Sequence, residues 1–200
     1  MQADIEPASK RRDPISEVFH LYDPPLWLVT ARHQDRRGGL IATLAVRASI
    51  VAQIPRMVVG IAKHHHTWGL IEDSGAFALH LLRADDLEAV WRFGLASGHT
   101  QDKLAGLPER HSPAGNPLYP QALAWLDCRV EERMDTGDRT LYLAQVTGGA
   151  PLTQGTALSV GMLLRNAPQE WLAELDRLYR TDQALDSAAI LAWRQARRNA

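Results

Sequence analysis

Apolar residues in the first three quarters of the chain come in short runs that are separated by turn residues. Such runs, rich in β-branched and aromatic residues, are typical of β-strands. Several of them are apolar almost throughout, which indicates strands that are buried. The pattern predicts six strands, at residues 26–31, 40–50, 56–62, 76–82, 122–131 and 140–146.

Helical spacing of apolar residues predicts short helices between these strands, at 14–21, 67–74 and 85–93. Gly75 follows the second of them directly and is suited to end it in a left-handed conformation. A turn is expected at 35–39, where two glycines follow charged residues.

The chain changes character after Pro168. Leucines and aromatic residues recur there at helical spacing, so the pattern predicts a helix, followed by a second one from about Asp186 to Arg198. Strands before residue 150 and helices after it favour a mainly β fold of the α+β kind, built as a barrel. The expected organisation is a flexible N-terminal arm at 1–13, a barrel domain at 14–155 and a C-terminal helical extension at 156–200, which could wrap around a partner subunit.

Composition narrows the function classes. The chain has 200 residues, is 46% hydrophobic and carries a formal net charge of −1, so it can build a core and is not expected to bind nucleic acid. Its single cysteine, Cys128, cannot form an internal disulfide, which favours a reducing compartment. No apolar run approaches the ~20 residues that span a bilayer, and the N-terminus lacks the apolar segment of a secretory signal. We therefore expect a cytoplasmic protein without a membrane partner.

The stretch from Gly38 to Thr67 carries the candidate chemistry. Its first half is rich in glycine and in small or hydroxyl side chains, and its end holds Lys63 and three histidines. Small side chains let a flat ligand lie close to backbone N–H and C=O groups, and a cationic end with a hydroxyl suits a phosphate. This combination favours a cradle for flavin mononucleotide (FMN).

The three histidines at 64–66 also raise the question of a metal. Neighbouring residues at a strand end point to opposite faces, and no carboxylate or cysteine accompanies the histidines at ligand spacing. We therefore predict no metal, favour anion or flavin binding, and keep plain surface histidines as the alternative. His80 is expected to be a core histidine with satisfied hydrogen bonds, and Cys128 a buried apolar residue.

Six phrases in fixed order carry a family resemblance. They are LWLVTAR (26–32), GGLIAT…ASI (38–50), AKHHHTWGLIEDSGAFALHLL (62–82), FGLASGHTQDKLAG (93–106), ALAWLDCRV (122–130) and TGDRTLYLAQV (136–146). Together they resemble the flavin reductase-like, FMN-binding split-barrel family, over roughly residues 14–150. The resemblance implies a six-stranded Greek-key split barrel that forms a homodimer, with FMN, or alternatively FAD, near the interface.

The resemblance also implies a set of site residues. The flavin ring would lie against Ala42, Thr43, Leu44, Ala48, Ser49 and Ile50. The phosphate would lie at Lys63, His65, His66 and Thr67. A loop over the flavin would bring Phe93 and Ser97 to the ring and Lys103 to the phosphate or the pyrimidine edge. Asp138 and Arg139 are candidate substrate-binding residues. Relatives often carry Asp-His at this turn, and the arginine of this chain, which is permanently charged and forked, could hold the phosphate or carboxylate of an incoming ligand.

The activity that this family implies is hydride transfer from NAD(P)H to flavin, with the reduced flavin passed to a partner monooxygenase or another acceptor. No catalytic triad, dinucleotide fingerprint or phosphate-binding loop motif occurs in the sequence. Two alternatives remain open from the sequence. One is a flavin-binding electron-transfer module without nicotinamide activity, and the other is a heme- or ligand-binding protein on the same barrel.

Overall fold

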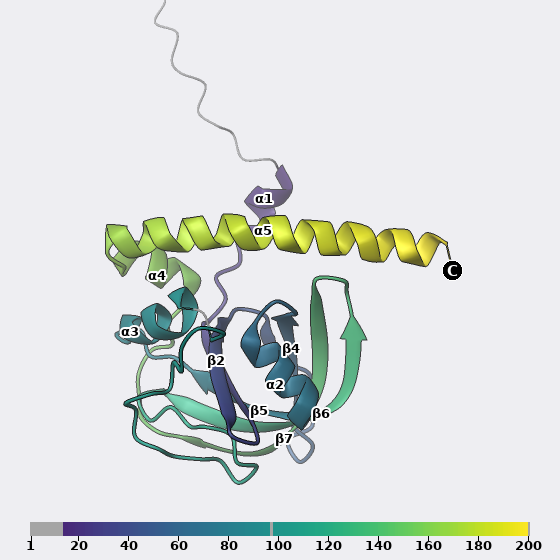
Figure 1. Ribbon diagram of the computed structural model, residues 1–200. Helices are drawn as coiled ribbons and strands as arrows, with labels where there is room; N and C mark the ends of the chain where they lie inside the picture. The colour runs from purple at the N-terminus through teal and green to yellow at the C-terminus, as the bar shows by residue number, and fades with distance from the viewer. Residues whose placement is uncertain (1–13, 97, 200) are drawn as a thin grey trace, which may run out of the picture.

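The structure is a computed structural model that describes residues 14–96 and 98–199. It is mainly β, as predicted, with short helices between the strands and a long C-terminal helix (Figure 1). The strands are β1 (Trp27–His33), β2 (Arg36–Ala42), β3 (Ala45–Arg47), β4 (Arg56–Ala62), β5 (Ala76–Leu81), β6 (Ala124–Asp135) and β7 (Arg139–Pro151). They form one sheet in the order β2-β1-β5-β6-β7-β4-β3, and every pairing is antiparallel.

The two edges of this sheet are joined by only two residues. Strands β2 and β3 lie at opposite ends of the strand order, yet Thr43 and Leu44 alone separate them in the chain. The sheet must therefore curve until its edges meet. The carbonyl of Leu44 accepts a hydrogen bond from the backbone N–H of Gly60 on β4 at 2.9 Å, which fixes this corner. The expected single strand at 40–50 was wrong for this reason: it breaks at the corner, so the sheet has seven strands and not six.

The expected turn at 35–39 is shorter than predicted. Residues 34–35 make the turn, and the two glycines lie inside β2. Their lack of a side chain permits close packing. A Cβ on Gly38 would lie 2.8 Å from His66 Nδ1, and one on Gly39 would lie 3.0 Å from the Phe93 ring. The absence of a side chain at Gly38 and Gly39 therefore allows α2 and η1 to pack closely on β2.

The core has two parts. Inside the curved sheet, Leu70 and Ile71 of helix α2 (His66–Ser74) are buried against apolar residues of the strands. A second cluster lies on the other face of β1, under α3 (Leu87–Val90), the π-helical turn η1 (Trp91–Leu95) and α4 (Val160–Asn166). Because β1 is covered on both faces, the residues Leu28–Ala31 in its middle are all buried.

Two predictions for single residues are confirmed. His80 is fully buried; its Nδ1 donates to the Leu28 carbonyl at 3.2 Å, and its Nε2 accepts from the Tyr119 backbone N–H at 3.1 Å. Cys128 is also fully buried, and burial raises the pKa of its thiol to about 12. Neither side chain is available for chemistry with a ligand.

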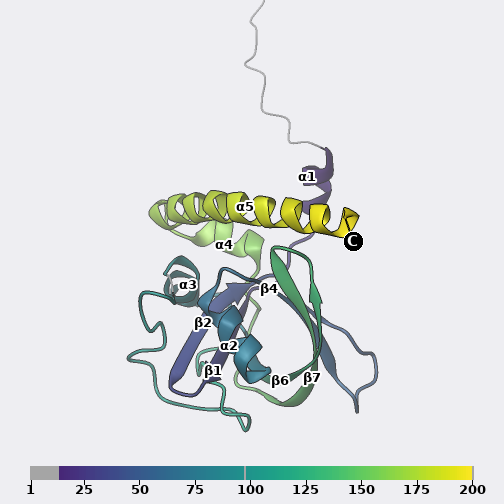
Figure 2. The ribbon, with the colours of Figure 1, turned by 45° about the vertical axis from the view of Figure 1, so that its right-hand side comes forward.

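The C-terminal segment forms one continuous helix, α5 (Gln169–Arg198), and not the two that were expected. It contains no glycine or proline, and its exposed face carries ion pairs at helical spacing, Glu174 with Arg177 and Asp176 with Arg180. Both views show α5 lying across one end of the barrel, above α4 and the tip of the β6–β7 hairpin (Figures 1 and 2). No described helix is both long enough and apolar enough to cross a membrane.

Helix α1 (Pro14–Phe19) begins the described part of the chain, and the flexible arm predicted for 1–13 lies outside the described residues. The predicted boundary between barrel and extension, at 155–156, stays a prediction.

Two glycines of α2 make a matched pair for a stability test. Gly75 ends the helix with φ of 67°, whereas Gly69 lies inside it, with open space where a Cβ would point. We expect Gly75→Ala to lower the free energy of unfolding by about 1 kcal/mol or more, and Gly69→Ala to raise it by up to about 1 kcal/mol. Urea unfolding of both variants checks this. Equal effects of the same sign would contradict the assignment of the helix end.

Candidate functional site

A cavity of about 970 Å³ lies between the barrel corner and helix α5. Its floor comes from residues 40–44, on and after β2, and from 60–62 at the end of β4. Its roof comes from one face of α5, between Tyr179 and Arg194. The corner that joins the sheet edges is thus the floor of this cavity, and the roof comes from the opposite end of the chain.

A smaller chamber of about 200 Å³ adjoins this cavity. The two share a wall made of Leu40, Ile41, His64, His65 and Asp182. The smaller chamber is further lined by the start of α2, by residues 93–96 and by Lys103. One chamber is therefore wide with largely small or apolar floor residues, and the other is narrow and rich in imidazole and cationic groups.

Contacts at three places hold α5 over the cavity. Trp171 stacks on Trp91 of η1, with ring centroids 4.7 Å apart. At the opposite end of the helix, Trp193 packs closely on Gly137. A Cβ added to Gly137 would lie 2.8 Å from the Cβ of Trp193. Between them, the Asp186 carboxylate pairs with the Arg139 guanidinium at 2.7 Å. Contacts near both ends of α5 and the Asp186–Arg139 ion pair therefore hold the helix in place, and the space between the helix and the barrel corner stays open.

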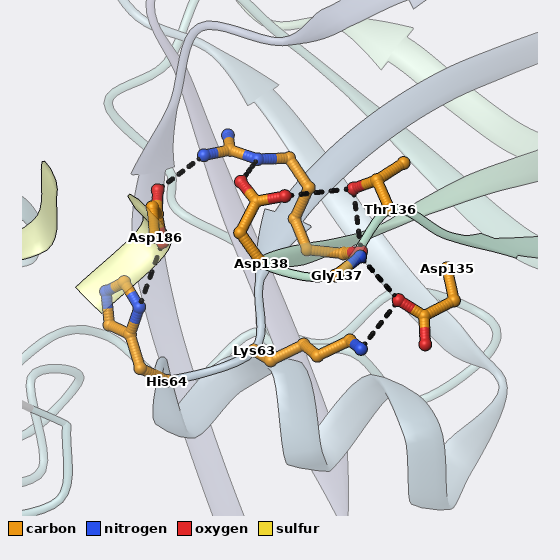
Figure 3. Close-up of polar contacts among 8 residues, drawn as sticks. Lys63, His64, Asp135, Thr136, Gly137, Asp138 and Asp186 are labelled. Atoms are coloured by element: carbon orange, nitrogen blue, oxygen red, sulfur yellow. Dashed lines mark hydrogen bonds and ion pairs between the residues drawn. The ribbon is translucent and has the colours of Figure 1, made fainter. Parts of the chain in front are cut away.

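The β6–β7 turn organises the charges beside this roof (Figure 3). Arg139 is bound on one side by Asp138, which also accepts from the Thr136 hydroxyl, and on the other side by Asp186 of α5. Lys63 points to the outer side of the same turn, where its Nζ meets the Asp135 carboxylate at 2.7 Å. That hydrogen bond lowers the pKa of Asp135.

Helix α2 begins at the smaller chamber. Its N-cap residue is His65, whose side chain makes no capping hydrogen bond, and the first helical residues, His66 and Thr67, line the chamber. Free N–H groups at a helix N-terminus favour anions. The His66 Nδ1 atom is buried there without a hydrogen-bond partner in the described structure. The local backbone and this side chain thus leave polar groups that a ligand can satisfy.

Burial and neighbouring cations keep these histidines neutral. The pKa of His65 is lowered to about 4, chiefly by desolvation and in smaller part by the nearby His64, Lys103 and Arg139. Desolvation and the neighbouring His99 also lower the pKa of His66. At neutral pH both rings therefore offer a lone pair and one N–H rather than a positive charge.

Lys103 is the cation that faces the smaller chamber. Its side chain is 8% exposed, its Nζ donates to the Phe93 carbonyl at 2.7 Å, and desolvation lowers its pKa to about 8. The adjacent Asp102 is turned to Arg37 instead. None of the ion pairs formed by the described residues includes Lys103. A buried ammonium with a single carbonyl partner is a favourable place for an anion.

The structure brings many of the predicted site residues together and leaves others apart. Those that line one of the two chambers are Ala42, Thr43, Leu44, His65, His66, Thr67, Phe93, Lys103 and Arg139. Those that line neither are Ala48, Ser49, Ile50, Lys63 and Asp138. Ile50 is 95% exposed, and Lys63 is bound to Asp135. Ser97 lies outside the described residues. The ligand contacts themselves stay predictions for every one of these residues.

Sequence reasoning missed the contribution of α5. It recognised the apolar stripe of this segment, but not that Asp182 and Asp186 would meet His64 and Arg139. One signal was present: two acids four residues apart lie on the same face of a helix. Their partners lie on the barrel, far away in the chain, and no local pattern identifies them.

Comparison with known proteins assigns the family. A family model described as the flavin reductase like domain matches residues 19–159, which is more than half of the chain. The protein therefore belongs to the flavin reductase like family. The match ends directly before α4 and α5, so the roof of the cavity lies outside it.

Curated relatives give the range of proteins that share this domain. A high molecular weight rubredoxin of Moorella thermoacetica is 29% identical over 146 residues, covering 72% of this chain and 63% of that protein. The reductase subunit HsaB of a flavin-dependent monooxygenase from Mycobacterium tuberculosis is 28% identical over 150 residues, covering 73% of each chain. The chain thus spans less than two thirds of the first of these two relatives.

Solved structures agree on the fold. The NADH:FAD oxidoreductase SgcE6 of Streptomyces globisporus superimposes with a TM-score of 0.65 at 20% identity, covering 76% of this chain and 93% of that one. An FMN-binding protein from Thermus thermophilus, with 1-cyclohex-2-enone bound, superimposes with a TM-score of 0.62 at 21% identity, covering 74% and 81%. At this level of identity the likeness concerns the fold alone.

The neutral histidines predict how stability depends on pH. The pKa values of His65 and His80 are lowered from 6.5 to about 4, so below pH 6.5 the unfolded chain binds protons that the folded chain does not. The free energy of unfolding should therefore fall as the pH drops from about 6.5 to 4. Urea unfolding across this range measures the slope. His65→Gln should reduce this slope by an amount that corresponds to at most about one proton fewer taken up on unfolding. An unchanged slope would contradict the buried, neutral state of His65.

Proposed function

We propose that the protein is a flavin reductase, which binds FMN in the two adjoining chambers under α5 and transfers hydride to it from NAD(P)H. The observation that carries this proposal is the pairing of a wide chamber, floored by Ala42–Leu44, with a narrow one that holds the buried, unpaired ammonium of Lys103. A flat ring system and a phosphate need these two environments side by side. The family to which the chain belongs supports the same conclusion.

The wide chamber suits the ring. Its floor is the corner at residues 42–44, where Ala42 and Thr43 have short side chains that leave room for a flat ligand. Arg139 lies in the wall of the same chamber, opposite Asp186 of the roof. The floor residues would orient the flavin, and the roof would keep water from its upper face.

The narrow chamber suits the phosphate. Lys103 supplies a charge, the start of α2 supplies backbone N–H groups at His66 and Thr67, and the His66 ring supplies a buried nitrogen that lacks a partner. About 200 Å³ is room for one such group, which favours FMN over FAD. This assignment keeps the predicted roles of His66, Thr67 and Lys103, and it moves the cationic contact away from Lys63.

Bound flavin supplies the hydride chemistry, so the chain needs no catalytic triad. The residues of the chain bind, orient and exclude water. The positive end of α2 and the Lys103 ammonium stabilise negative charge in the narrow chamber, which favours an anionic group such as a phosphate there. Arg139 directs its Nε to Asp138 and its Nη2 to Asp186, so an incoming phosphate or carboxylate would bind at Nη1 or would compete with these two carboxylates.

We also propose a homodimer that passes reduced flavin to a partner oxygenase. Three apolar residues of α1, Ile15, Val18 and Phe19, are each more than 60% exposed, and an apolar face of this kind suits a second copy of the chain. The proposed oxygenase partner rests on relatives such as HsaB, whose name describes a reductase subunit. Light scattering of the purified protein tests the dimer. The buried, single Cys128 supports a cytoplasmic location.

The two lysines provide a matched test of the phosphate site. We expect Lys103→Gln to weaken FMN binding by about tenfold or more, because it removes the cation from the narrow chamber, and to change riboflavin binding little. Lys63→Gln removes the same charge from the Asp135 pair outside the chambers and should leave FMN affinity unchanged. Fluorescence titration with both flavins measures this. A loss for Lys63→Gln and none for Lys103→Gln would reverse the assignment.

Activity is tested by mixing the flavin-loaded protein with NADH and with NADPH without oxygen. The proposal predicts that the visible absorbance of the flavin bleaches rapidly with at least one of them. Flavin that binds but does not bleach would favour an electron-transfer module. A heme spectrum with no flavin affinity would favour the ligand-binding alternative and overturn the proposal.

A further inference from the structure

Three side chains beside the cavity converge although they come from distant parts of the chain. His64 and His65 lie in the connection between β4 and α2, and Asp182 lies on α5. One ligand atom of each lies within 4.8 Å of one ligand atom of both others, and all three residues are partly buried. The sequence predicts no metal here because no carboxylate lies near the histidines in the chain. The fold supplies that carboxylate from the C-terminal helix.

The contacts of His64 resemble those of a metal ligand more than those of a plain ion pair. Its Nε2 is buried and lies 3.3 Å from an Asp182 oxygen, yet the two do not have hydrogen-bond geometry. Its other nitrogen, Nδ1, faces an Asp186 oxygen at 3.7 Å (Figure 3). A histidine that binds a metal through one nitrogen commonly directs the other to a carboxylate, which orients the ring. Asp186 is placed for that supporting role.

The charges around the cluster favour a cation. Asp182 and Asp186 face His64, while Asp138 and Asp186 bind the guanidinium of Arg139. In this contact network three carboxylates meet one guanidinium, so the network is negative beside the two imidazoles, with Lys103 as a further cation near His65. A bound metal cation would offset the remaining negative charge. Two imidazoles and a carboxylate are, in turn, a ligand set that zinc and similar ions use.

We propose that His64, His65 and Asp182 bind a divalent transition-metal ion such as Zn²⁺, which fastens α5 to the barrel, with Asp186 orienting His64. Ligands to one zinc ion sit about 2.0–2.2 Å from it, so the side chains must close in slightly from their present separation. The fourth position faces the cavity. This proposal concerns the roof and does not depend on the proposed flavin reductase activity.

The test uses the full chain without a histidine tag, freed of metal with EDTA. Calorimetric titration with Zn²⁺ should give one ion per chain, and Co²⁺ should produce the visible absorption bands of a site with nitrogen and oxygen ligands. Loss of a direct ligand, in His64→Ala or Asp182→Asn, should weaken binding by about tenfold or more. Asp176→Asn removes an acid from the same helix, where it pairs only with Arg180, and should bind metal as the unchanged chain does.

Two further measurements keep the outcome decisive. Circular dichroism without metal shows whether each variant folds, and His65→Gln provides a third ligand change if one of the others does not. Zn²⁺ should also slow amide hydrogen exchange in α5, and should not do so in Asp182→Asn. Absence of binding, or equal affinity in Asp182→Asn and the unchanged chain, would overturn the proposal. The flavin titrations are made on the metal-free chain, so a failure of this proposal is distinguishable from a failure of the proposed function.

Discussion

The two-residue link between β2 and β3 is the constraint on which the rest of the structure depends. Thr43 and Leu44 join opposite edges of a seven-stranded sheet, so the sheet has to curve until its edges meet. The bond from Gly60 N–H to the Leu44 carbonyl holds that corner. The interior then needs a helix to fill it, which α2 provides, and the corner itself becomes a recess with small side chains. The position of the cavity under α5 follows from how the sheet closes.

Helix α5 completes the cavity by both apolar and polar contacts. None of its residues is fully buried; it meets the barrel through the Trp171–Trp91 stack, through Leu172 and Leu175, and through the contacts of Asp182 and Asp186. A roof held in this way can be tuned by ligands or ions that compete for the same charged groups. The family domain ends before α4, so this chain carries its roof as an addition to a shared barrel.

The sequence was most informative where a feature is local. Apolar runs located most strands, Gly75 marked the end of α2, and the ordered phrases from 26 to 146 identified the family. The sequence was not informative where contacts between segments far apart in the chain determine the structure. A break of one apolar run at Thr43 cannot be told from a continuous strand, because both residues of the corner have ordinary side chains. The partners of Lys63 and Arg139 depend on the hairpin tip and on α5, so the binding role of Lys63 could not be judged from its neighbours.

The central claim is that one flavin occupies both chambers, with its phosphate at Lys103. A crystal structure of the protein with FMN tests it most directly. The account predicts the ring on the floor formed by residues 42–44, under α5, and the phosphate within hydrogen-bond distance of Lys103 and the start of α2. Density for FMN on the outer face of the barrel, or a phosphate bound at Lys63 with Lys103 still on the Phe93 carbonyl, would contradict it.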